Sequence, residues 1–211
     1  FENPPDIHIA KLSEKFIDKP FFSGATARMN EDERDNSLKF IEEHFMFIDY
    51  TNGESSTIDS VLEKAIGAVR QIGARGLVID PYNYLDMDKN SLSETDAISS
   101  MLTKISQFAK AHDIHVWFIA HPTKLYPDMK GKIPVPTGYS ISGSASWFAK
   151  ADLGITVHRS EGTDVEIHCW KCRFKWIGTQ GETMLEYYPP TGVYSEKSNE
   201  VNYVEEFDWE F

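Results

Sequence analysis

Several features that mark other protein classes are scarce or absent in this sequence of 211 residues. No run approaches the ~20 apolar residues that a membrane helix needs, and no basic-then-apolar leader opens the chain. No segment repeats at a fixed period, and the 13 glycines and 10 prolines are ordinary usage. These absences argue against membrane-spanning, solenoid and disordered proteins. We expect a single soluble, intracellular globular core with no membrane partner.

Positive charge and cysteine are also scarce. The 21 Lys and Arg stand against 33 Asp and Glu, for a net charge of -12, whereas a general nucleic-acid coat needs clustered cations. Any DNA contact is therefore expected to be local. Cys169 and Cys172 have the C-x-x-C spacing of a redox pair or half a zinc site, but residues 165–174 alternate like a strand and place them on opposite faces. We expect two reduced thiols in a reducing compartment.

The last residues differ in composition from the rest. Acidic and aromatic residues interleave over 196–211, as is typical of a solvated tail, with a docking peptide for a partner as the alternative. The sequence therefore predicts a core over 1–195 and an acidic, aromatic tail over 196–211.

Helical and strand patterns alternate along the core. Pro4 and Pro5 suit a first helical turn, Asn30 with Glu33 resembles a capping box, and a short strand is expected at 45–48. The apolar runs at 76–80 and 115–120, with a helical pattern between them, are typical of parallel strands buried on both faces.

The second half of the core looks richer in strands. A helix is expected near 144–150, and alternating runs at 153–157, 165–174 and 183–188 predict an antiparallel extension. The fold class is therefore α/β, with a mixed, mostly parallel sheet flanked by helices and a β-rich C-terminal part.

Three polar residues follow apolar strand patterns directly. Ligands of open α/β sheets bind beyond the carboxyl ends of the strands, so Glu2, Asp80 and His121 are candidates. Asp80 suits a carboxylate that holds Mg²⁺ on nucleotide phosphates, Glu2 a base that orients water, and His121 a phosphate sensor. The alternatives are a turn-forming Asp, an acid at a helix N-terminus and a polar strand end.

Two cations lie on one face of a later predicted strand. Lys171 and Arg173 are two residues apart, so they point the same way, either as a solvated edge or toward an anion on a neighbouring subunit. No G-x-x-x-x-G-K-[ST] occurs, and the Gly131-Lys132 pair is followed by isoleucine. Without that cradle, we expect this stretch alone to bind ATP poorly and to be inactive.

Taken in order, these segments resemble the helicase half of phage primase-helicases and of Twinkle, relatives of the DnaB-like replicative helicases, over about residues 1–194. Residues 1–4 resemble the motif with the catalytic glutamate, 76–83 Walker B, 118–124 the sensor segment, 141–152 the fourth helicase motif, and 171–174 the arginine-finger segment. The resemblance implies a RecA-like ATPase core with its P-loop strand and helix upstream of residue 1.

The resemblance also implies roles for single residues. Glu2 would be the base, Asp80 would hold Mg²⁺ with Asn83 beside the ATP or other NTP, and His121 would be the sensor. Arg173, with Lys171, would stabilise charge on the neighbouring subunit's γ-phosphate.

The predicted loop between His121 and Gly138 resembles the DNA-tracking loop of these helicases. Lys124, Lys130 and Lys132 would contact phosphates there, and an ordinary solvated loop is the alternative. Phage relatives carry an arginine where Ser142 stands here, so no basic role is carried to that position.

The sequence thus favours an ATP-dependent replicative DNA helicase motor that moves on single-stranded DNA as a ring, with a hexamer and a primase domain or replisome partner implied. The alternatives are a RecA-type recombinase-like ATPase and a catalytically inactive module that binds DNA or the replisome. The compartment expected is a bacterial or phage-infected cytoplasm, or the mitochondrial matrix for an organellar protein.

Overall fold

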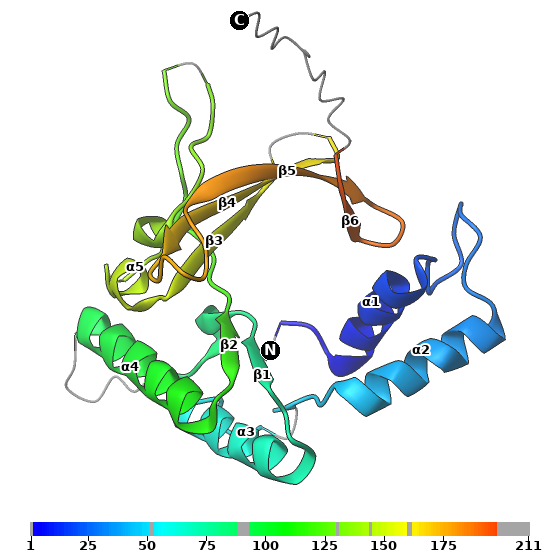
Figure 1. Ribbon diagram of the computed structural model, residues 1–211, viewed down its shortest axis with the longest axis horizontal. Helices are drawn as coiled ribbons and strands as arrows, with labels where there is room; N and C mark the ends of the chain where they lie inside the picture. The colour runs from blue at the N-terminus through cyan, green and yellow to red at the C-terminus, as the bar shows by residue number, and fades with distance from the viewer. Residues whose placement is uncertain are drawn as a thin grey trace, which may run out of the picture.

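The protein combines helices with two separate sheets (Figure 1). The computed structural model describes residues 2–50, 53–87, 93–129, 131–143, 145–159 and 162–197. Strands β1 (Gly76–Ile79) and β2 (His115–Phe118) form a parallel pair, and β3 (Leu153–His158), β4 (Asp164–Cys172), β5 (Gly181–Tyr188) and β6 (Val193–Glu196) form an antiparallel sheet in chain order. The predicted α/β class is confirmed. The strands lie in two sheets instead of one mixed sheet, and antiparallel strands outnumber parallel ones among the described residues.

Two N-terminal helices, α1 (Pro5–Ile17) and α2 (Glu31–His44), pack as a pair. Phe16 of α1 stacks on Phe40 of α2 with ring centroids 4.2 Å apart. The capping box predicted at the start of α2 is confirmed, since Asn30 and Glu33 exchange two side-chain-to-backbone hydrogen bonds of 2.8 Å.

The main core lies between the parallel pair and helices α3 (Ile58–Ile72) and α4 (Glu94–His112). Thr57 caps α3, Gly73 ends it in the left-handed conformation at φ 69°, and Ser93 caps α4. The cluster includes Val61, Leu62, Ala65, Ile79, Tyr82, Ile98, Met101, Ile105, Phe108 and Trp147. These helices cover one face of β1 and β2.

The other face of the parallel pair is open in the described part of the chain. Val78 is 60% exposed and Trp117 52% exposed, while the alternate residues Ile79 and Phe118 belong to the core side. The prediction that both strands are buried on both faces is therefore wrong here, because helices pack on only one of them. The strand predicted at 45–48 is also wrong, since these residues pair with no strand among the described segments.

The antiparallel sheet follows the short helix α5 (Ser146–Lys150), as the alternation of the sequence predicted. The ring of Trp170 lies over Gly154, where a Cβ would fall 2.3 Å from the ring, and this ring stacks on Phe148 of α5 with centroids 5.2 Å apart.

The last strand of this sheet, β6, was not predicted from the sequence. Lys197 pairs with Asp164 at 2.7 Å, and residues 198–211, with most of the predicted tail, lie outside the described residues.

Candidate functional site

Asp80 and His121 follow two strands that end at one edge of the parallel pair. Ile79 is in register with Phe118, and the amide of Ile119 donates to the carbonyl of Ile79 at 2.9 Å. Asp80 therefore leaves β1 beside the point where the chain leaves β2 toward His121. Asp80 is partly buried, and His121 is exposed.

The chain after Asp80 stays at this edge. The Asp80–Pro81 peptide bond is cis, and the short 3-10 helix η1 (Tyr82–Tyr84) follows. The amide of Tyr82 donates to the carbonyl of Ile119 at 3.0 Å, which ties η1 to the continuation of β2. Asn83 lies in η1 and is exposed, so the structure keeps three of the predicted nucleotide residues on one side of the sheet.

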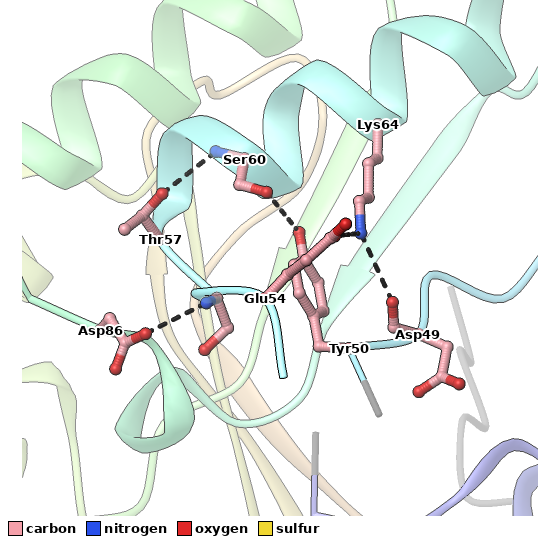
Figure 2. A network of polar contacts seen from close by, with 8 residues as sticks. Asp49, Tyr50, Glu54, Thr57, Ser60, Lys64 and Asp86 are labelled. Carbon is pink, nitrogen blue, oxygen red and sulfur yellow. Dashed lines mark hydrogen bonds and ion pairs between the residues drawn. The ribbon is translucent and has the colours of Figure 1, made fainter. Parts of the chain in front are cut away.

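A polar network fixes the loop before α3 to the segment after η1 (Figure 2). Asp86 accepts hydrogen bonds from the hydroxyl of Ser55 at 2.7 Å and the amide of Ser56 at 3.1 Å. Nearby, Lys64 of α3 pairs with Glu54 at 2.7 Å and lies 3.9 Å from the ring centroid of Tyr50 (Figure 2). The start of α3 is thereby held next to the segment that carries Asp80 and Asn83.

One carboxylate at this edge suits Mg²⁺, which is commonly bound by one or two carboxylates together with substrate phosphates. Among the described residues, no group of three or more His, Cys, Asp or Glu side chains is arranged to hold a metal ion alone. Asp80 fits one ligand of a Mg²⁺–nucleotide complex, and the phosphates would have to supply the others.

Helix α5 connects this edge to the predicted finger strand. Trp147 is 6% exposed and contacts both Tyr82 and Phe118, with ring centroids 4.7 and 5.3 Å away. Burial raises the pKa of Tyr82, and the nearby charge of Glu94 acts in the same direction. The ammonium of Lys150 donates to the carbonyl of Ser99, which joins the end of α5 to α4.

Lys171 and Arg173 meet at the C-terminal end of α5, so the prediction that they face the same way is confirmed. The ammonium of Lys171 donates to the carbonyls of Phe148 and of Ala149, the latter at 3.0 Å. Arg173 donates to the carbonyls of Ala149 at 2.8 Å and of Ala151 at 3.3 Å. Cations at a helix C-terminus donate hydrogen bonds to its free carbonyls and interact favourably with the negative end of the helix dipole.

Arg173 also forms an ion pair with the carboxylate of Asp152, the residue directly before β3. Its Nη1 lies 2.9 Å from Oδ1 of Asp152, and its amide donates to the carbonyl of Asp152 at 2.9 Å. Burial lowers the pKa of Lys171, the charge of Arg173 lowers it further, and Asp152 opposes the change. No sequence pattern singled out Asp152 as a partner of the arginine.

The predicted DNA loop projects from the body between β2 and the 3-10 helix η2 (Gly138–Ser140) (Figure 1). Its base is held by the amide of Thr123, which donates to the carbonyl of Ser140 at 2.7 Å. At its tip, Asp128 accepts from the amide of Lys132 at 2.9 Å, and Gly131 takes the left-handed conformation at φ 79°. Hydrogen bonds between described residues thus hold both the base and the tip of this loop.

Basic and apolar side chains are displayed on this projection. Lys124 and Lys132 are exposed, and the ammonium of Lys124 lies 5.7 Å from the ring centroid of Tyr126, which is 73% exposed. Lys130 lies outside the described residues. The aromatic residue escaped the sequence prediction, which looked for cations only.

The predicted base, Glu2, precedes α1 and is exposed, and Phe1 lies outside the described residues.

The two cysteines form no disulfide. The thiols of Cys169 and Cys172 are free, and the sulfur of each lies near the carbonyl oxygen of the residue two positions further along, at 3.4 and 3.5 Å. Of the described helices, none is long and apolar enough to span a bilayer.

Comparison with known proteins gives one close sequence relative and several structural ones. No family model matches the chain. The Twinkle homolog protein, chloroplastic/mitochondrial, of Arabidopsis thaliana is 41% identical over an alignment of 206 residues, which covers 92% of this chain and 29% of that protein. This chain therefore spans less than a third of the relative's length.

Two solved structures share the fold. An ATPase domain superposes with a TM-score of 0.74 at 16% identity, covering 93% of this chain and 72% of that one. A DnaB-like replicative helicase, solved in a study of its interactions with primase, superposes with a TM-score of 0.72 at 18% identity, covering 93% and 50%. The resemblance found in the sequence is confirmed: the chain is similar in sequence to part of the Twinkle homolog, and it has the fold of the ATPase domain and of the DnaB-like replicative helicase.

Proposed function

We propose that this chain is part of the motor of a DNA helicase that hydrolyses ATP and moves along single-stranded DNA as a ring. The observation that carries the proposal is the placement of Asp80 and His121 at one edge of a parallel pair, with α5 linking that edge to Lys171 and Arg173. The 41% identity to the Twinkle homolog favours this function over a recombinase-like ATPase.

In this proposal, Asp80 would hold Mg²⁺ on the nucleotide, and Asn83 and His121 would contribute polar groups to the same site. ATP and Mg²⁺ supply the phosphoryl group and the charge that neutralises it. Glu2 would orient the attacking water, and its exposed position before α1 leaves its carboxylate open to solvent. Arg173 and Lys171 would serve the nucleotide of the next subunit, so catalysis would depend on assembly, for which a hexamer is the proposed form.

The projecting loop is the proposed DNA contact. Lys124 and Lys132 supply local positive charge on a chain of net charge -12, and the exposed ring of Tyr126 suits stacking on a base. Lys130 is proposed as a further phosphate contact. A primase domain or replisome protein is the proposed partner, and an organellar compartment like that of the plant relative stands beside a bacterial or phage setting.

The test is ATP hydrolysis by the full-length gene product with and without single-stranded DNA. Asp80→Asn should abolish the DNA-stimulated rate, because the amide cannot replace the carboxylate on Mg²⁺. Asp113→Asn is the matched control, since Asp113 is an exposed αL residue at the end of α4, and asparagine tolerates that conformation. A wild-type protein that binds single-stranded DNA without hydrolysing ATP would favour the inactive binding module instead.

A further inference from the structure

The guanidinium of Arg173 is held by groups of its own chain. It contacts one carboxylate oxygen and two backbone carbonyls, from Asp152, Ala149 and Ala151, at 2.8 to 3.3 Å. Its side chain is still 38% exposed. An exposed arginine loses considerable side-chain entropy when it is fixed in one rotamer, and several directed contacts reduce the further loss on binding a ligand.

The position of Asp152 follows from the sheet. Leu153 pairs with Cys172 at the end of the β3–β4 ladder, so the next residues outward, Asp152 and Arg173, are cross-strand neighbours. The backbone hydrogen bond between them continues the ladder by one step. The carboxylate is therefore attached to the same rigid frame as the arginine, as a positioning group must be.

Lys171 completes the arrangement from the other side. Its ammonium donates to the carbonyls of Phe148 and Ala149, and its Nζ lies 5.1 Å from the centroid of the Phe148 ring. The two cations thus share the end of α5, and of the two only Arg173 has a carboxylate partner within ion-pair distance among the described contacts. This difference between the two cations singles out Arg173 as the one whose orientation is fixed by a carboxylate.

We propose that Asp152 is a positioning residue that orients Arg173 toward the nucleotide of a neighbouring subunit. The inference rests on the proposed function, and it extends it by a residue for which no role had been assigned. Asp152 acts through Arg173 and touches no phosphate itself. Its loss should lower the rate of hydrolysis and leave nucleotide binding in place, because the arginine serves the transition state.

The experiment measures kcat and KM for ATP in the full-length gene product with single-stranded DNA. Asp152→Asn should lower kcat by about 10- to 100-fold, by analogy with groups that orient metal ligands, and leave KM within about twofold. Asp152→Glu should recover part of kcat, since it keeps the charge. Asp164→Asn is the control, because it removes a similarly exposed ion pair, Lys197–Asp164, at the start of β4, the strand that leads to Arg173.

Mixed oligomers separate this role from a purely structural one. Subunits with Asp152→Asn and subunits with Asp80→Ala should together regain activity, since some interfaces then combine an intact Asp80 with an intact Asp152–Arg173 pair. A structural defect would not follow that pattern. Wild-type kcat in Asp152→Asn overturns this inference alone, whereas a wild-type protein without DNA-stimulated hydrolysis overturns the proposed function and this inference together.

Discussion

Trp147 packs against Tyr82 with ring centroids 4.7 Å apart and ring planes at 62°. Tyr82 follows the cis peptide bond after Asp80, and Trp147 lies in α5, whose last carbonyls accept from Lys171 and Arg173. A single buried indole therefore joins the edge proposed to bind one nucleotide to the cations proposed to serve the next. The following predictions test this connection and its surroundings.

Replacing Trp147 with alanine should destabilise the protein by about 3–5 kcal/mol, because it removes a large side chain from a core that does not collapse fully. Urea unfolding followed by far-UV circular dichroism measures the change. Trp176→Ala is the matched control, since Trp176 is 76% exposed, and its free energy of unfolding should change by about 0.5 kcal/mol or less. Equal stability of the two variants would contradict the buried contact.

Gly154→Ala should destabilise the antiparallel sheet by about 1–3 kcal/mol. A Cβ at this position would fall 2.3 Å from the ring of Trp170, which has Phe148 stacked on it and cannot move freely. Gly67→Ala in α3 provides the control, because a Cβ there meets nothing within 4 Å and alanine favours a helix by about 1 kcal/mol. Thermal melts should therefore shift in opposite directions for the two variants.

Glu166 should contribute a pH-dependent part of the stability. A hydrogen bond with His168, 2.8 Å long, lowers the pKa of Glu166 below its ordinary 4.5, and burial opposes this. A carboxyl with a depressed pKa stabilises the fold above its unfolded value, and the contribution is lost as the pH falls through the folded value.

The comparison is between wild type and Glu166→Gln. The urea midpoint of the variant should be lower at pH 7, and the two midpoints should converge as the pH falls well below 4.5. The exposed Glu63 of α3 gives the control variant, Glu63→Gln, which should follow wild type throughout. A constant difference between wild type and Glu166→Gln at all pH values would contradict the assignment.

The proposed DNA contact predicts a stacking signature on the projecting loop. Tyr126→Ala should weaken binding of a labelled oligothymidylate by about 1–3 kcal/mol, while Tyr126→Phe keeps the ring and should bind like wild type. Lys124→Gln should instead reduce the slope of log K against log salt by about 0.7, as expected for one phosphate contact. Fluorescence anisotropy at several salt concentrations measures both, and an identical effect of Ala and Phe at position 126 would rule out stacking.

The sequence predicted the features that depend on local signals. The capping box at Asn30 and the helix between the two apolar runs at 76–80 and 115–120 each depend on neighbouring residues, and both are confirmed. The common edge of Asp80 and His121 also followed, because two apolar runs joined by a helix form a parallel pair with one hand of connection.

Features that depend on distant partners were not predicted. Asp152 lies 21 positions before Arg173, and their pairing depends on the register and the bulge of β3 against β4. The residues 45–48 have a strand-like pattern, but a strand exists only where a partner strand is available. The open face of the parallel pair likewise depends on which elements pack there, and apolar periodicity does not encode that.

The contact between Asp18 and Thr191 has a consequence for the order of folding. The hydroxyl of Thr191, which is almost completely buried, donates to the carboxylate of Asp18 at 3.0 Å across 173 positions of the chain. Closing so large a loop costs more entropy than the nearby pairings of β1 with β2 or β3 with β4, so it should come after them. Helix α1 leaves the ribosome before the other described elements, yet its C-terminal end can contact the β5–β6 turn only when synthesis of the described chain is nearly complete.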